Sequence, residues 1–105
     1  MLCRNGETVE SPVEGVPIGL LEDQEYDHLD IVVQPGDVFL LYSDGVEDQL
    51  SGDEEYGRER LEKLVLGSCH QSPREIAKAI FEDIDRFRGA TPLTDDQTVI
   101  VFKVL

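Results

Sequence analysis

The sequence predicts an α+β fold, in which helices pack on an antiparallel sheet. Three observations support this class. Two short β-forming segments lie at residues 26–33 and 38–42, two amphipathic helical segments follow at 57–66 and 72–87, and a last strand closes the chain at 97–105. Strands and helices are grouped rather than alternating one by one, which favours an antiparallel sheet over a parallel one.

The two early strands differ in their expected burial. Polar and apolar side chains alternate in residues 26–33, which is typical of a half-buried strand. One face carries Tyr26, His28 and Asp30, and the other carries Leu29, Ile31 and Val33. Residues 38–42 form a short continuous apolar run, which indicates a buried strand. The Pro35-Gly36-Asp37 turn between them allows the two strands to form an antiparallel hairpin.

The second helical segment has a complete start signal. Ser72 can cap the helix, Pro73 takes the first helical position, and Glu75 completes a capping box. The apolar stripe that follows consists of Ile76, Ala77, Ile80, Phe81, Ile84 and Phe87. Gly89 can end this helix. The stripe predicts that one face of the helix covers the sheet.

The other elements follow from spacing and turn residues. The first helix carries Leu61, Leu64 and Val65 at helical spacing. Near the start of the chain, Asn5-Gly6 is a turn signal between two short extended pieces. In the last strand, Val99, Val101 and Lys103 share one face. Because this strand and residues 38–42 have matching apolar patterns, we expect them to be antiparallel neighbours in one sheet.

Composition excludes several classes of protein. The chain has 105 residues, of which 40% are hydrophobic, so it is one domain or part of one, with enough apolar residues for a core. A net charge of −14, from 23 acidic and 9 basic residues, argues against nucleic acid and anionic membranes as partners and suits a protein that gathers cations. No apolar run approaches the ~20 residues of a membrane span. Two cysteines, Cys3 and Cys69, form no disulfide framework, so we expect a cytoplasmic protein.

Asp44 is the strongest candidate for chemistry. It directly follows the buried strand 38–42, and Gly45 permits a sharp turn after it, so its carboxylate is presented at the rim of the sheet. Mg²⁺ and Mn²⁺ prefer oxygen ligands that are held rigidly. An Asp-Gly pair after a strand is more often a simple turn, so Asp44 alone does not define a site.

Asp95 and Asp96 are the second candidate. They precede the last strand as Asp44 follows an earlier one, so antiparallel pairing of those two strands would bring all three carboxylates to the same edge of the sheet. Three like charges repel one another unless a cation lies between them. The alternative for this pair is a solvated acidic turn.

Other phosphate and metal chemistries do not fit. A calcium-binding EF-hand loop that began at Asp44 would need a ligand at Val46 and glycine at Gln49. A haloacid-dehalogenase-like phosphatase would need its aspartate nucleophile at Tyr42, which cannot replace it. His28 and His70 have no other metal ligands at suitable spacing, so zinc is disfavoured and both are expected at the surface.

Five segments in one order resemble a known family. They are Gly15-Val16-Pro17-Ile18-Gly19, Pro35-Gly36-Asp37, Tyr42-Ser43-Asp44-Gly45-Val46, Tyr56-Gly57 with Leu61, and Asp95-Asp96-Gln97-Thr98. The chain, residues 1–105 as one piece, resembles the C-terminal half of PPM-type metal-dependent protein phosphatases. The similarity is greatest to the bacterial branch of stage II sporulation protein E and the sigma-factor regulatory phosphatases.

The resemblance implies a fold, a reaction and a metal site. The fold would be part of a four-layer α-β-β-α sandwich, and the reaction would be hydrolysis of phosphoserine or phosphothreonine in a protein. Asp44 and Asp95 would bind a dinuclear Mg²⁺ or Mn²⁺ centre that activates water for in-line attack on phosphorus. Asp96 would be a further ligand or would orient the ligands, since related eukaryotic members carry Asn there. Gly45 would support the turn.

The chain departs from the family in its first half. The family's Asp-x-x-Gly motif and Gly-His-x-Pro segment are absent from all 105 residues. We therefore expect the chain alone to be inactive, and a non-catalytic binding or regulatory module remains the alternative to an enzyme. Half of a two-sheet sandwich also leaves an apolar face or strand edge uncovered, so we expect a homodimer, strand exchange or a marginally stable monomer.

Overall fold

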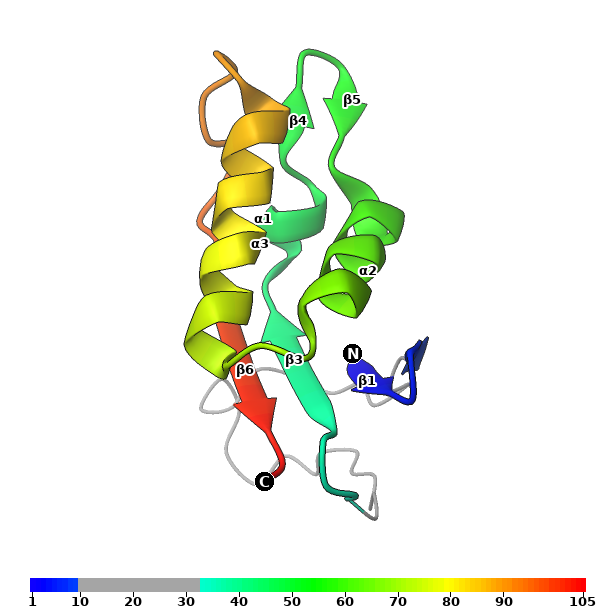
Figure 1. The fold of residues 1–105 in the computed structure, drawn as a ribbon. Coiled ribbons are helices and arrows are strands. Elements are labelled where there is room, and N and C mark those ends of the chain that lie inside the picture. Colours follow the sequence, from blue (N-terminus) through cyan, green and yellow to red (C-terminus); the bar gives the residue numbers. More distant parts are fainter. Residues whose placement is uncertain (10–32) are drawn as a thin grey trace, which may run out of the picture.

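The computed structural model describes residues 1–9 and 33–105. In chain order the elements are β1 (Leu2–Arg4), β2 (Glu7–Val9), β3 (Val38–Tyr42), α1 (Asp44–Glu47), β4 (Leu50–Ser51), β5 (Glu54–Glu55), α2 (Gly57–Ser68), α3 (Pro73–Arg88) and β6 (Val99–Lys103) (Figure 1). The predicted α+β class is confirmed. None of the helices in these two ranges is both long and apolar enough to cross a membrane.

The pairing of β3 with β6 is the central contact of the sheet. The strands β2, β1, β3 and β6 lie side by side in that order, and every neighbouring pair is antiparallel. The register of β3 and β6 runs from Val38 opposite Lys103 to Tyr42 opposite Val99, so the predicted neighbours are confirmed. The other side of β3 is occupied by β1, which the sequence analysis did not place there.

Three expectations concern the first third of the chain. The strand expected at 26–33 and the loop at 15–19 lie outside the described residues, apart from Val33, which belongs to no strand. The turn at Asn5-Gly6 is confirmed, because it joins β1 to β2. Both of its residues have positive φ, 51° for Asn5 and 76° for Gly6. Asn and Gly suit this conformation better than other residues do.

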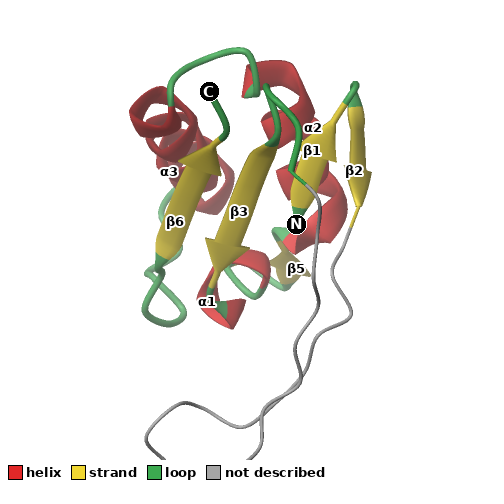
Figure 2. Ribbon diagram, turned by 90° about the horizontal axis from the view of Figure 1, so that it is seen from below, coloured by secondary structure: helices red, strands yellow, loops and turns green. Residues whose placement is uncertain are grey.

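Both long helices cover the same face of the sheet. Figure 2 shows α2 and α3 behind the strands. The predicted start of α3 is confirmed, because the Glu75 N–H donates to Ser72 Oγ at 3.2 Å and Pro73 is the first helical residue. The Glu75 carboxylate accepts a hydrogen bond from the Ser72 hydroxyl at 3.0 Å. Gly89 caps the far end with a φ of 55°.

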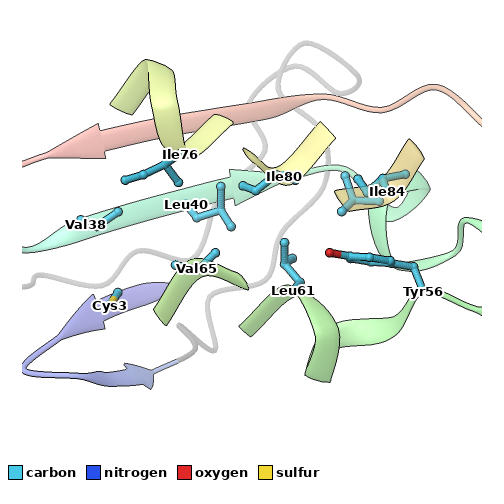
Figure 3. Packing of buried hydrophobic residues seen from close by; sticks show 10 residues of the cluster. Cys3, Val38, Leu40, Tyr56, Leu61, Val65, Ile76, Ile80 and Ile84 are labelled. Atoms are coloured by element: carbon cyan, nitrogen blue, oxygen red, sulfur yellow. The ribbon is translucent and has the colours of Figure 1, made fainter. Parts of the chain in front are cut away.

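The core lies between the helices and the sheet. Side chains of β3 point toward those of α2 and α3, and Tyr56 closes one end of the cluster (Figure 3). The buried apolar residues are Cys3, Val38, Leu40, Val46, Tyr56, Leu61, Val65, Ile76, Ile80 and Ile84. The helical spacing in α3 predicted the centre of its buried face, since Ile76, Ile80 and Ile84 have zero exposure. The prediction was wrong for Phe81, which is 37% exposed at the edge of the stripe.

The opposite face of the sheet is apolar and open to solvent. Leu41, Ile100 and Phe102 are 54%, 46% and 55% exposed. Leu41 lies opposite Ile100, and Phe39 lies opposite Phe102, so these four side chains form one patch across β3 and β6. We call this patch the open sheet face. A sheet with one face buried and the other face apolar is suited to contact with a further layer.

The start of β3 is fixed by an ion pair whose carboxylate is buried. Asp37, from the predicted Pro-Gly-Asp turn, is 1% exposed and accepts hydrogen bonds from Arg4 Nε at 2.9 Å and from Arg4 Nη2 at 2.6 Å. The Gln34 N–H also donates to Asp37 Oδ2 at 2.8 Å. The hydrogen bonds from Arg4 lower the pKa of Asp37 below its ordinary value of 3.8, against the opposing effect of burial.

Asp37→Asn should make the free energy of unfolding of the chain less dependent on pH in the acid range. A carboxyl whose pKa is lowered by folding stabilises the fold above its unfolded pKa, and that contribution is lost as the pH falls through the folded value. The variant should therefore be less stable than wild type near neutral pH, and the difference should narrow below the ordinary pKa of 3.8. Urea unfolding from about pH 7 down to about pH 2.5 measures this.

Asp53→Asn, in the exposed turn between β4 and β5, is the control for loss of one acidic charge. A difference between Asp37→Asn and wild type that stayed constant over the whole pH range would contradict the prediction.

Candidate metal centre

Asp44 lies where β3 ends and α1 begins. It is the first residue of α1, its side chain is exposed, and its carbonyl accepts from the Asp48 N–H at 2.9 Å. The residue before it, Ser43, makes the last backbone hydrogen bond between this strand and the chain before β6, since its N–H donates to the Thr98 carbonyl at 3.0 Å. The sequence analysis expected a turn here and did not predict the helical turn α1. The expected position of Asp44 at the rim of the sheet is confirmed.

Asp95 and Asp96 lie in the loop before β6, at the same end of the sheet as α1 (Figure 2). Both side chains are exposed, and the Asp96 N–H donates to Asp95 Oδ1 at 2.8 Å. Besides its backbone bond to Thr98, Ser43 is bound to this loop by two hydrogen bonds of its hydroxyl group. Its Oγ accepts from the Thr98 N–H at 2.9 Å and donates to the Asp96 carbonyl at 3.3 Å.

Gly45 is a glycine because another chain segment lies against it. A Cβ on Gly45 would be 2.1 Å from the carbonyl oxygen of Asp96 and 3.5 Å from the carbonyl carbon of Asp95. Gly45 is not one of the described glycines that have a positive φ. The chain turns here from β3 into α1, and a positive φ is not what requires glycine at this position. The absent side chain instead allows the Asp95–Asp96 backbone to contact the start of α1.

The described residues supply part of a metal site. In residues 1–9 and 33–105, no group of three His, Cys, Asp or Glu side chains is close enough to hold a metal ion. The structure brings the segments that carry Asp44, Asp95 and Asp96 together but does not form a closed cage. Mg²⁺ commonly takes one or two protein carboxylates and keeps several waters, so this oxygen-rich pair of segments fits one side of such a centre.

The remaining candidates for chemistry have structural positions. His70 is exposed, as expected, and His28 lies outside the described residues. Burial, together with contact with Cys69, raises the pKa of the Cys3 thiol to about 11. A thiol with such a pKa is a poor nucleophile at neutral pH.

The whole chain matches one protein family. The model of the family described as stage II sporulation protein E (SpoIIE) matches residues 1–105. The chain belongs to this family. The expected relationship to the sporulation and sigma-factor branch of the PPM-type phosphatases is thereby confirmed.

Two characterised relatives share this sequence region. The phosphoserine phosphatase RsbU of Bacillus subtilis (strain 168) is 29% identical over 90 residues, which are 86% of this chain and 27% of RsbU. The stage II sporulation protein E of Priestia megaterium is 28% identical over 102 residues, which are 96% of this chain and 17% of that protein. The chain therefore spans about a quarter or less of the relatives it matches.

Solved structures share the fold. The SiaA-PP2C domain of Pseudomonas aeruginosa superimposes with a TM-score of 0.72 at 26% identity, over 79% of this chain and 35% of that one. The phosphatase domain of SpoIIE from Bacillus subtilis, from a manganese-presoaked sample, gives 0.66 at 20% identity, over 98% of this chain and 44% of that one. The fold of this chain is thus the fold of part of a PP2C-type phosphatase domain.

Gly45→Ala should displace the Asp95–Asp96 loop. The added Cβ would overlap the Asp96 carbonyl, and overpacking of this kind typically costs about 1–3 kcal/mol. Amide chemical shifts of residues 94–98, with urea unfolding alongside, would detect both effects. Gly67→Ala is the matched control, because Gly67 lies within α2 with open space around it, and alanine there should stabilise the chain by about 0.5–1 kcal/mol. Unchanged loop shifts in Gly45→Ala would contradict the assigned contact.

Proposed function

We propose that this chain is the C-terminal, metal-binding part of a phosphatase domain that removes phosphate from serine or threonine of a regulatory phosphoprotein. The observation that carries the proposal is the β3–β6 pairing, because it brings the Asp44 turn and the Asp95–Asp96 loop to one end of the sheet. Family membership and the phosphoserine phosphatase RsbU support the reaction class. The cytoplasm is the proposed location, as the sequence suggested.

Asp44 and Asp95 are the proposed ligands of Mg²⁺ or Mn²⁺, in a centre that is dinuclear in the complete domain. The manganese-presoaked SpoIIE structure supports this choice of metal. Asp96 orients Asp95, since its N–H donates to the Asp95 carboxylate at 2.8 Å. When bound, such metals lower the pKa of water and offset negative charge on phosphoryl oxygens. Gly45 and Ser43 hold the two carboxylate-bearing segments in contact.

We propose that the 105-residue chain alone has no phosphatase activity. It carries no Asp-x-x-Gly or Gly-His-x-Pro segment, and it aligns with 44% of the SpoIIE phosphatase domain. A catalytic metal site needs its ligands positioned to within about half an ångström. This favours a shared site completed by residues that the 105-residue sequence does not contain.

A non-catalytic binding or regulatory module is the second candidate, favoured by the missing group of three ligands among the described residues. Reading the gene upstream of Met1 separates the two. An in-frame continuation with both missing motifs supports the enzyme, and hydrolysis of a phosphoserine peptide by that longer product with Mn²⁺ would test it directly. An in-frame stop codon supports the module.

Asp44→Asn and Asp95→Asn should each weaken Mn²⁺ binding by at least about tenfold, since each removes a charged oxygen ligand. Calorimetric titration of Mn²⁺ into the chain measures this. Asp53→Asn is the matched control, because it removes one exposed acidic charge in the β4–β5 turn and leaves the proposed site intact. Equal binding by Asp44→Asn and wild type would remove Asp44 from the site.

We also propose that a second copy of the chain covers the open sheet face in solution. Burial of about 400 Å² of apolar surface on each copy, at ~25 cal/mol/Å², contributes about 20 kcal/mol before association and ordering costs. The net charge of −14 opposes association, but salt screens charges beyond ~8 Å. The apolar contribution should therefore exceed the repulsion.

Sedimentation at micromolar concentration should detect this dimer, and Phe102→Lys should shift it toward monomer. Phe81→Lys is the matched control, because Phe81 is exposed on α3 and the change in charge is the same. A cooperative, strictly monomeric wild-type chain would show that the open sheet face needs no cover.

A further inference from the structure

Gln49 lies between α1 and β4 and is fully buried, with an exposure of 0%. Its Nε2 donates to the Leu50 carbonyl at 2.9 Å and to the Pro92 carbonyl at 3.1 Å. Its Oε1 accepts from the Thr94 N–H at 3.2 Å and from Gln97 Nε2 at 3.0 Å. Three of these four partners belong to the loop that carries Asp95 and Asp96.

The four contacts use the full hydrogen-bonding capacity of the amide, which has two donors and two acceptor sites. They also fix its orientation. The carbonyls of Leu50 and Pro92 require a donor, and the Thr94 N–H requires an acceptor, so exchanging the oxygen and nitrogen would break all three bonds. Gln49 is held from its own backbone as well, since its carbonyl accepts from the Tyr56 N–H at 2.7 Å.

Neighbouring bonds join the same two segments. Gln97 Nε2 also donates to the Gly45 carbonyl at 3.4 Å. The Leu50 N–H donates to Thr94 Oγ1 at 3.1 Å, and the Gly52 N–H donates to Thr91 Oγ1 at 3.0 Å. Hydrogen bonds therefore join the segment 91–97 to the segment 45–52 at several points along both. Among these links, Gln49 is the buried group with the most bonds to the loop.

We propose that Gln49 is a positioning residue: its amide fixes the Asp95–Asp96 loop against the Asp44 turn and so sets the spacing of the carboxylates for a divalent cation. The inference rests on the proposed function. An apolar side chain of similar size would fill the same buried space with no polar group to satisfy. A glutamine with four oriented bonds instead specifies where the loop lies, and buried, fully satisfied networks are rigid in this way.

The test uses Gln49→Met in the 105-residue chain. Methionine has a similar length but offers none of the four hydrogen bonds. Gln71→Met is the matched control, because Gln71 lies in the turn between α2 and α3, and its carbonyl is bound by Lys103 at the opposite end of β6 from the loop. Gln49→Glu is the second variant. It keeps the acceptor for Thr94 but places an oxygen against the carbonyls of Leu50 and Pro92.

The first measurement needs no metal. Amide hydrogen exchange at residues 94–98, followed by NMR, should be at least about tenfold faster in Gln49→Met and unchanged in Gln71→Met. The second measurement is line broadening by Mn²⁺. In wild type, the amide signals of Asp44 and Gly45 should broaden at the same Mn²⁺ concentration as those of Asp95 and Asp96. In Gln49→Met, the Asp95 and Asp96 signals should need about tenfold more Mn²⁺ than in wild type.

Faster exchange with weaker and unequal broadening supports the proposal, and Gln49→Glu should give the same result if Gln49→Met does not fold. Wild-type exchange in both Gln49 variants overturns it. So does faster exchange with wild-type broadening, because Gln49 would then support the loop without setting the carboxylates. If Mn²⁺ broadens neither segment in wild type, the proposed metal function fails, and the exchange rates alone decide whether Gln49 fixes the loop.

Discussion

The antiparallel pairing of β3 with β6 is the constraint on which the rest of the structure depends. It joins residues that are some sixty positions apart, from Val38 opposite Lys103 to Tyr42 opposite Val99. One face of this pair supplies Val38 and Leu40 to the core beneath α2 and α3. The end of the same pair brings Ser43 to Thr98, and this places the loop before β6 against the start of α1. Core and candidate site are thus two consequences of one register, and a one-residue slip would move both.

The two regions are stabilised by different physical means. Apolar packing, chiefly by Ile76, Ile80 and Ile84 of α3, stabilises the centre of the fold. The end of the sheet that carries the candidate metal site depends instead on polar contacts and on the absence of a Cβ at Gly45. Such contacts are directional, so they determine where the backbone lies more strictly than apolar packing does. Exposed carboxylates can therefore be placed accurately without entering the core, where charges would be costly.

Sequence periodicity predicted the elements that contribute to the core, and it did so for physical reasons. The apolar run 38–42, the stripe in α3 and the alternation in β6 each reflect burial on one face. It did not predict that β1 lies beside β3, because pairing of a three-residue strand depends on tertiary contacts such as that between Arg4 and Asp37. Gln49 was also missed. A single buried amide in an acidic segment has no periodic signal, and its importance comes from partners that lie more than forty residues away.

The acidic side chains are also placed differently in the core and at the candidate metal site. The chain carries a net charge of −14, yet among the described residues the buried acidic side chain is Asp37, which is paired with Arg4. Asp44, Asp95 and Asp96 are instead exposed on segments held in contact by Gly45 and Ser43. Repulsion between carboxylates favours separation of these segments, whereas the hydrogen bonds of Ser43, Gln49 and Gln97 oppose it. A bound divalent cation would reverse the sign of the electrostatic contribution, so metal binding and the closeness of the two segments should reinforce each other.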